Sequence, residues 1–192
     1  MAARRAGSHG QVCATDGACD TPQGDAGRGG DLGRADPMRC NDAGLSIIKQ
    51  FEGCRLSSYQ DSGGIWTVGY GHTGTEVVPD LTWTQDQADA QLADDIVGRA
   101  ETPIDTLVKY ELDDNKYSAL VSFVFNIGSG NFAKSAVLTA INAGDLDDAP
   151  THMNAWVHDR AGNVDKGLVR RRSAEIELYE TPVDDDSDEM TA

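Results

Sequence analysis

Beyond residue 41, hydrophobic residues recur at helical spacing along most of the chain. The first such pattern places Leu45, Ile48 and Phe51 three residues apart. Asn41 or Asp42 can cap the start of this helix, and Gly53 is a natural residue to end it. The same periodicity, bounded by capping or breaking residues, predicts further helices over 84–100, 114–125, 135–143, 147–157 and 167–179.

Between residues 59 and 73 the pattern changes to strands and turns. Residues 60–64 read Gln-Asp-Ser-Gly-Gly, which is typical of a turn, and residues 65–70 are β-branched and aromatic. We expect a small hairpin or a three-stranded sheet. The whole pattern predicts an α+β, mainly helical, two-lobed fold, with a small N-terminal β-sheet lobe and a helical C-terminal lobe. A cleft between two lobes is the natural place for a ligand.

The two ends of the chain differ from this pattern. Residues 1–40 contain almost no aliphatic side chains, and their arginines and aspartates cancel. Such a segment cannot bury enough apolar surface to fold, so we expect a disordered N-terminal extension. Residues 41–180 then form one domain, and 181–192 form an acidic disordered tail. An alternative is that translation begins at Met38.

The net charge of −16 limits the partners that we expect. An acidic surface repels nucleic acid and anionic membranes, so neither is an expected partner. No apolar run approaches the length that spans a bilayer, and the N-terminus lacks the apolar region of a secretory signal. The acidity is either that of an ordinary soluble protein or an adaptation to high salt, where screening removes self-repulsion.

The four cysteines indicate no metal site. None of the spacings between Cys13, Cys19, Cys40 and Cys54 is Cys-x-x-Cys. We therefore expect free thiols, no metal and no cofactor. Cys54 is either a small buried side chain or a thiol switch.

Glu52 is the first candidate for chemistry, because it falls in the last turn of the predicted helix. The helix dipole and burial both favour the protonated carboxyl there, and a general acid working near neutrality needs that form. Asp61 follows in the turn and Thr67 on the strand. Two carboxyl groups across a cleft are the arrangement of glycoside hydrolases, and a gap of about 6.5–9.5 Å admits a water and inverts configuration. The alternatives are an exposed Glu, a turn-forming Asp and an ordinary strand Thr.

Several spaced motifs carry a resemblance to a known family. Glu52, eight residues, Asp61, five residues and Thr67, with Gly-Tyr-Gly-His-Thr at 69–73, resemble the phage-type lysozymes (endolysins) of glycoside hydrolase family 24. The matching segments are 48–53, 59–61, 119–128 and 167–172. The resemblance runs from about residue 42 to 180.

This resemblance implies a monomeric lysozyme that cleaves the β-1,4 bond between N-acetylmuramic acid and N-acetylglucosamine in peptidoglycan and so lyses the host cell. It implies that Glu52 is the general acid. Asp61 would stabilise the developing oxocarbenium charge and orient the attacking water, and Thr67 would hold that water. The protein would wait in the host cytoplasm until a holin releases it to the wall.

Other positions take roles from the same resemblance. His72 would make a structural hydrogen bond or ion pair, and Thr73, Phe125 and Ser135 would line the saccharide cleft, although Phe125 could equally belong to the core. The inter-lobe helix would correspond to 84–100, with Pro103 beginning a fresh helical turn and shortening it.

Two features of the chain bear on how it works. At least one arginine of 170–172 should pair with an acid. Many family members are basic and this chain is acidic, so we expect weak activity at low salt. The alternative functions are a lytic transglycosylase, which needs only the acid, and a non-catalytic wall-binding virion module.

Overall fold

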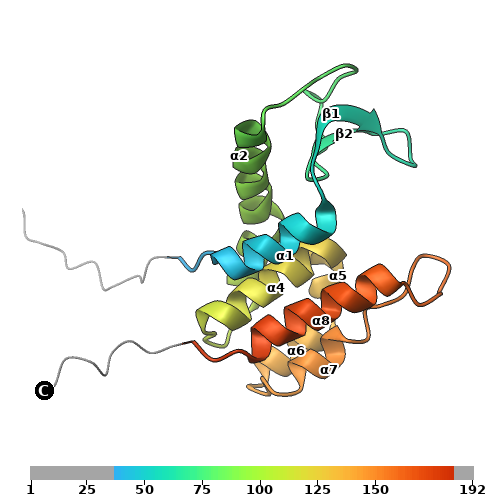
Figure 1. The fold of residues 1–192 in the computed structure, drawn as a ribbon. Helices are drawn as coiled ribbons and strands as arrows, with labels where there is room; N and C mark the ends of the chain where they lie inside the picture. Colours follow the sequence, from blue (N-terminus) through green and yellow to red (C-terminus); the bar gives the residue numbers. More distant parts are fainter. Residues whose placement is uncertain (1–36, 184–192) are drawn as a thin grey trace, which may run out of the picture. The chain divides into compact units, whose positions relative to one another are not determined.

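The computed structural model describes residues 37–183 of the chain. Helix α1 (Asp42–Glu52) comes first, followed by the antiparallel strands β1 (Arg55–Gln60) and β2 (Trp66–Gly69). The remaining elements are helical: α2 (Gln85–Ile96), the π-helical turn η1 (Val97–Glu101), α3 (Thr102–Leu107), α4 (Asp114–Ile127), α5 (Ser129–Phe132), α6 (Ala136–Asn142), α7 (Ala149–Met153) and α8 (Lys166–Glu180). The prediction of an α+β, mainly helical fold is confirmed (Figure 1).

Helix α4 is the centre of the helical part. Its side chains from Tyr117 to Phe125 are all buried, as expected of a helix that other elements surround on every side. Helices α1 and α8 pack against it, and α6 and α7 complete the layer below (Figure 1). Burial of each large apolar side chain here, such as Phe123, stabilises the fold by about 1.5–3 kcal/mol. This packing fixes the positions of α1 and α8 relative to each other.

Helix α1 begins and ends where the sequence predicts. The Asn41 side chain caps it by accepting a hydrogen bond from the Gly44 amide at 3.0 Å. Gly53 ends it with a φ of 66°, a value that favours glycine. Ile48 is fully buried against the core. Glu52 is therefore the last residue of a helix that is held along its length.

The strands and the loops that follow them, residues 54–84, form a unit that we call the hairpin lobe. The two strands pair with Tyr59 opposite Thr67, and the register shifts between Arg55 and Tyr59. The first strand starts at Arg55, before the segment in which the sequence pattern indicates strands. The strands form a two-stranded sheet, and an isolated bridge between Ser57 and Thr82 ties the later loop to it. The hairpin lobe and α2 stand on the same side of the other helices (Figure 1).

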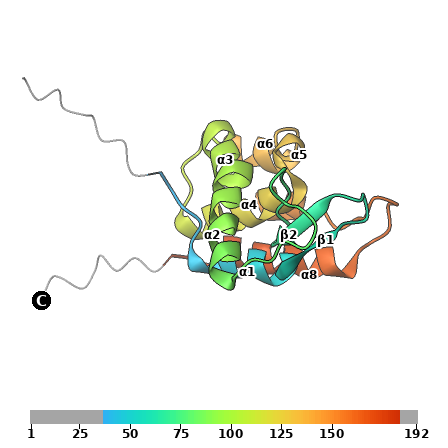
Figure 2. The ribbon, with the colours of Figure 1, turned by 90° about the horizontal axis from the view of Figure 1, so that it is seen from above.

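The prediction that a helix ends near Ala100 and that Pro103 shortens it is wrong. Helical turns continue without a break from α2 through η1 into α3, and α3 continues the line of α2 beside α4 (Figure 2). The Thr102 amide donates to the Val97 carbonyl across the wider π-helical turn. Pro103 then falls in the first turn of α3, where a missing amide hydrogen is tolerated.

Two helices differ from the predicted ranges. Helix α5 lies between the predicted helices 114–125 and 135–143, and α7 has only five residues of the predicted 147–157. Trp156 lies beyond α7, where its ring meets Phe123 edge to face at 6.1 Å. On α8 the charged side chains of Arg171, Arg172 and Glu175 are buried, and helical periodicity in the sequence does not indicate such burial.

The segment before α1 is attached to the helices. Arg39 Nη1 donates to Glu101 Oε2 at 2.6 Å, and the Cys40 amide donates to Glu101 Oε1 at 2.9 Å. These residues belong to the extension that the sequence predicts over 1–40, whereas 1–36 and 184–192 lie outside the described residues. Among the described helices, none is long and apolar enough to cross a membrane.

The chain leaves α4 through Gly128, whose backbone conformation favours glycine. It has a φ of 84° and a ψ of 148°, and a Cβ added there would meet no atom within 4 Å. Because only the backbone opposes a side chain, Gly128→Ala should lower the free energy of unfolding by about 1–3 kcal/mol. Urea denaturation measures this difference.

Gly130 provides the matched control. It is helical and exposed, and a Cβ added there also meets open space. Gly130→Ala should be neutral or stabilising by up to about 1 kcal/mol. Equal losses of stability in the two variants would contradict the account.

Candidate active site

Glu52 lies at the C-terminal end of α1, with a quarter of its side chain exposed. Arg171 Nη1 on α8 donates a hydrogen bond to Glu52 Oε1 at 2.6 Å. The Arg171 side chain is itself buried, with an exposed fraction of 3%. The sequence indicates that Glu52 lies at a helix end, but it does not indicate that Arg171, 119 residues further along the chain, pairs with it.

A buried charge network continues from Arg171 into the helical core. Arg171 Nε donates to Glu175 Oε1 at 3.0 Å, and Arg171 Nη2 donates to the Ser122 carbonyl at 3.2 Å. Ser122 Oγ donates to the same Glu175 oxygen at 2.7 Å. Arg172 Nη1 lies 3.2 Å from Glu175 Oε2, and Arg172 Nη2 donates to Asn126 Oδ1 at 2.7 Å. The prediction that at least one arginine of 170–172 pairs with an acid is confirmed.

Burial perturbs the ionisation of two members of this network. Burial raises the pKa of Glu175, although both neighbouring guanidinium groups oppose the change. Burial also lowers the pKa of Arg172 to about 10, against the attraction of Glu175. The perturbed groups therefore lie directly behind Glu52, on the far side of Arg171.

Asp61 lies in the turn of the hairpin, and Thr67 lies on its second strand. Asp61 Oδ1 accepts hydrogen bonds from the amides of Gly63 and Ile65, and the Asp61 amide donates to the Ile65 carbonyl at 2.9 Å. Thr67 lies opposite Tyr59, and its hydroxyl donates to the Ile65 carbonyl at 3.1 Å. Asp61 is exposed, and Thr67 has an exposed fraction of 4%.

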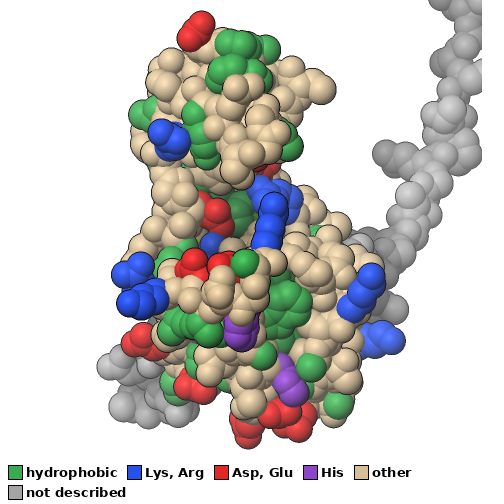
Figure 3. Space-filling model, turned by 90° about the vertical axis from the view of Figure 1, so that its right-hand side faces the viewer, with side chains coloured by type: hydrophobic (Ala, Val, Ile, Leu, Met, Phe, Trp, Pro, Cys, Tyr) green, Lys and Arg blue, Asp and Glu red, His purple; other side chains and the backbone are tan. Residues whose placement is uncertain are grey.

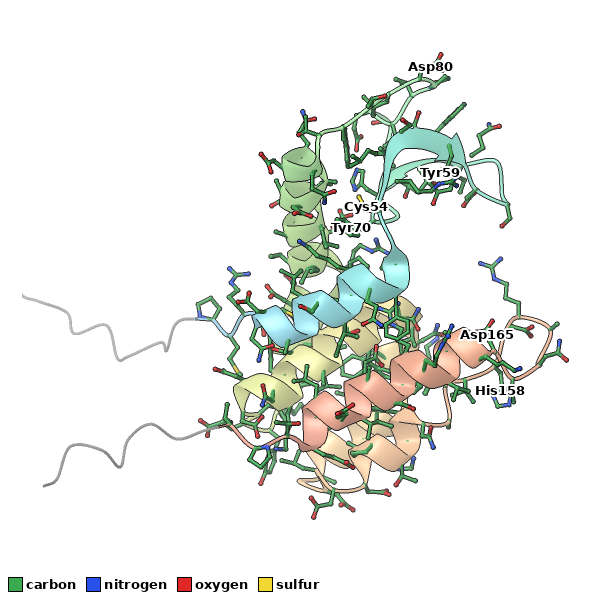
Figure 4. All side chains as sticks on the ribbon, in the orientation of Figure 1. Cys54, Tyr59, Tyr70, Asp80, His158 and Asp165 are labelled. Carbon is green, nitrogen blue, oxygen red and sulfur yellow. The ribbon has the colours of Figure 1, made fainter. Side chains whose placement is uncertain are left out.

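The three predicted catalytic residues thus come from three consecutive elements. Glu52 ends α1, and the hairpin that carries the other two rises from Gly53 (Figure 4). At the height of this junction, the surface is hollowed between the hairpin lobe and the helices, and acidic and basic side chains gather there (Figure 3). No hydrogen bond within residues 37–183 joins the three directly. The arrangement leaves room for a ligand between a helix end and a hairpin face.

His72 connects the hairpin lobe to α2. Its Nδ1 lies 2.9 Å from Asp95 Oδ2 on α2, and its Nε2 lies 2.6 Å from Glu76 Oε1. The ring stacks at a tilt on Trp83 with a centroid distance of 5.6 Å. Burial opposes the charge of His72, but the hydrogen bonds to the two carboxylates outweigh it and raise the pKa of the imidazole. His72 is therefore part of the attachment of the hairpin lobe.

A second polar cluster joins α1, α2 and the hairpin lobe. The Tyr70 hydroxyl donates to Asp89 Oδ1 at 2.9 Å, and Lys49 Nζ lies 3.1 Å from the same oxygen. Gln85 Nε2 donates to the Tyr70 hydroxyl at 3.0 Å. Burial raises the pKa of Tyr70 to about 12, so the hydroxyl stays protonated as a donor. Sequence reasoning missed this cluster, because its members lie on separate elements without a shared motif, and it did not identify Glu52 as a partner of Arg171.

The predicted substrate-binding residues differ in their accessibility. Thr73 is exposed. Phe125 is buried, and the guanidinium of Arg99 lies 4.3 Å from its ring centroid. Ser135 is also buried, and its hydroxyl donates to the Phe132 carbonyl and caps α6. A role of Phe125 or Ser135 in the cleft therefore rests on the family resemblance alone.

The cysteines also differ from one another. Cys54 is free and exposed beside Glu52, so the interpretation of it as a small buried side chain is wrong. Its neighbour Gly53 turns the chain outward and removes it from the core. Cys40 is free and half-buried, and burial raises its thiol pKa to about 12. Within the described part of the chain, no group of His, Cys, Asp or Glu is arranged to hold a metal ion.

Comparisons with known proteins agree with this fold. The family model described as phage lysozyme matches residues 49–175. An endolysin of Acyrthosiphon pisum secondary endosymbiont phage 1 is 38% identical over 147 residues, which is 75% of this chain and 99% of that protein. Endolysins of Lactococcus phage c2 and Bacillus phage B103 are longer, and this chain spans 65% and 55% of their lengths.

Solved structures give the same picture. The muramidase domain of SpmX from Asticaccaulis excentricus superposes with a TM-score of 0.70 at 36% identity, covering 76% of this chain and 99% of that one. A mutant of P22 lysozyme superposes with a TM-score of 0.68 at 33% identity, covering 75% of this chain and 99% of that one. The fold is therefore lysozyme-like. The chain belongs to the phage lysozyme family.

The His72 contacts predict a pH dependence of stability. Since folding raises the pKa of His72, its ion pairs contribute fully below the ordinary histidine pKa of about 6.5 and are lost as pH rises through the folded-state pKa. The stability gap between wild type and His72→Gln should therefore shrink from about pH 5.5 to about pH 8.5. Urea unfolding at each pH measures the gap.

His158 provides the control, because it is exposed and lies outside the hairpin lobe. His158→Gln should leave the pH dependence of wild type unchanged. A gap for His72→Gln that stays constant or widens with rising pH would refute the role of these ion pairs.

Proposed function

We propose that this protein is a phage-type lysozyme that hydrolyses peptidoglycan. The bond cleaved is the β-1,4 bond between N-acetylmuramic acid and N-acetylglucosamine, the reaction of an N-acetylmuramidase (EC 3.2.1.17). The observation that supports the proposal is that Glu52 ends α1 directly before a hairpin that carries Asp61 in its turn and Thr67 on its second strand. This placement occurs within the segment that matches the phage lysozyme family.

In the proposed mechanism, Glu52 donates its proton to the oxygen of the glycosidic bond as that bond breaks. Positive charge develops at the anomeric carbon, and the Asp61 carboxylate stabilises it from the hairpin. A water held by Asp61 and Thr67 attacks this carbon and passes a proton to Asp61. One oxygen of Asp61 is engaged with turn amides, which leaves the other oxygen for the water.

We further propose that the reaction inverts the anomeric configuration. A water can attack from the side opposite the leaving group only if the two carboxyl groups are far enough apart to admit it, about 6.5–9.5 Å. The placement of Glu52 on a helix end and Asp61 on a hairpin turn supports this separation, because the two residues belong to different elements.

The two alternative functions receive less support. A lytic transglycosylase excludes water and needs only the acid, so it gives no reason for Asp61 and Thr67 to lie on the same hairpin. A non-catalytic wall-binding module would not require Glu52 or Asp61. The relatives named endolysin and muramidase support a hydrolase.

The proposal includes a route to the substrate. The protein acts as a monomer on glycan strands, without stable association with a membrane, after a holin releases it from the host cytoplasm. The relatedness to phage endolysins supports a role in host lysis. Co-expression with and without a holin, followed by culture turbidity, tests the route separately from the chemistry.

Charge-neutralising variants test the catalytic roles. Glu52→Gln keeps an acceptor for Arg171 but has no proton to give, so turnover of purified peptidoglycan should fall about 100- to 10,000-fold. Asp61→Asn keeps the oxygen that binds the Gly63 and Ile65 amides, and it should lose about 100- to 1,000-fold through the missing charge. Release of soluble reducing ends measures both.

Glu177→Gln is the matched control, because Glu177 is on the same helix as Arg171 and takes no part in its ion pairs. It should retain the wild-type rate. Wild-type activity in Glu52→Gln, with folding verified by circular dichroism, would exclude the mechanism.

The stereochemical proposal has its own measurement. Direct displacement by water on a β-linked substrate should release the α-anomer first. Proton NMR of a soluble peptidoglycan fragment, recorded within the first minutes, distinguishes the anomers before they interconvert. Initial appearance of the β-anomer would indicate a retaining enzyme and refute inversion.

A further inference from the structure

Glu175 holds Arg171, the buried partner of Glu52, in place. Its Oε1 accepts from Arg171 Nε at 3.0 Å, while Arg171 Nη1 donates to Glu52 at 2.6 Å. Ser122 on α4 supports the same geometry through its hydroxyl and its carbonyl. Each nitrogen of the Arg171 guanidinium therefore has a partner, and its direction toward Glu52 is fixed.

Glu175 also lies between two positive charges. Arg172 Nη1 is 3.2 Å from Glu175 Oε2, and neither atom completes a hydrogen bond within the described residues. The Glu175 side chain is completely buried, so water does not screen these contacts. With Glu52 ionised, two carboxylates and two guanidinium groups balance, and loss of Glu175 would leave an excess positive charge behind Glu52.

Within residues 37–183, the ion pairs of Glu175 are those with the two arginines. Helix α4 contributes the uncharged side chains of Ser122 and Asn126, and α1 contributes Glu52 through Arg171. The charged residues on its own helix that face it are the two arginines. Helix α7, which also packs on α8, makes no ion pair with it in the part of the chain that the structure describes. The charge that Glu52 faces therefore depends on these few groups.

We propose that Glu175 is a positioning residue for the general acid: it aims Arg171 at Glu52 and cancels the charge of Arg172, and so sets the pH range in which Glu52 can donate a proton. This inference rests on the proposed role of Glu52. Glu175 does not touch the substrate. It acts through Arg171, and an enzyme without its charge would hold Glu52 in the ionised form that cannot act as an acid.

The pH–rate profile tests this proposal. Glu175→Gln removes one negative charge and keeps an acceptor for Arg171. On the alkaline limb of the profile, where activity falls as pH rises, the pH at which half of the activity is lost should fall by about one to two units. This is the effect expected between two carboxylates on the order of 7 Å apart at an effective dielectric constant of about 20. The maximal turnover near neutral pH should fall at least about tenfold, with KM for a soluble peptidoglycan fragment unchanged.

Arg172→Met changes the charge in the opposite direction. Removal of this buried cation leaves the charge of Glu175 without one of its two partners, so the alkaline limb should move to higher pH. The shift should be less than about one unit, because the ion pair of Arg172 is with Glu175, whereas Arg171 pairs with Glu52 directly. The double variant Glu175→Gln/Arg172→Met should move the alkaline limb only part of the way back toward its wild-type position, because the upward shift is the smaller of the two. Opposite shifts that offset each other in the double variant identify an electrostatic role, which a packing defect cannot reproduce.

The outcomes are separable. If Glu175→Gln does not fold, the shift in Arg172→Met alone decides the proposal. Unshifted limbs in the folded variants, with only a uniform loss of rate, would overturn it. If the proposed function itself is wrong, Glu52→Gln would remain active, whatever the pH–rate profiles of the other variants show.

Discussion

The contact between Glu52 and Arg171 depends on the packing of three helices, and it fixes the position of the Glu52 carboxylate. Helix α4 buries nine consecutive side chains, and α1 and α8 pack against it. This packing brings a helix end and an arginine 119 residues apart in sequence to within 2.6 Å. A buried guanidinium needs anionic or carbonyl partners, and the core supplies them from α4 and α8. Glu52 is thus held by the helical core and not by the hairpin.

The hairpin contributes a second constraint, which is its register. Tyr59 pairs with Thr67, and a shift by one residue would turn the Thr67 side chain to the other face of the hairpin. The hairpin lobe is fixed to α2 through His72 and Tyr70. The two sides of the cleft are therefore set by different interactions, a charge network in the core and polar contacts along α2.

Local signals in the sequence were sufficient for much of this architecture. The cap at Asn41, the glycine at 53 and the turn at 61–64 predicted where Glu52, Asp61 and Thr67 would lie on their elements, because each signal acts within a few residues. The continuation of the helix past Pro103 could not be predicted, since a π-helical turn has no sequence signature of comparable strength. The burial of Arg171, Arg172 and Glu175 was hidden for another reason: charged residues mark a solvated helix face unless the partners across the core are known.

The central claim is that a water, activated on the hairpin, completes the cleavage that Glu52 begins. Digestion of purified peptidoglycan in water labelled with heavy oxygen, followed by mass spectrometry of the released fragments, tests it most directly. The account predicts fragments that end in reducing N-acetylmuramic acid carrying the heavy oxygen at its anomeric carbon, formed by wild type and not by Glu52→Gln. Anhydro-sugar ends without label, or labelled ends formed equally by Glu52→Gln, would contradict it.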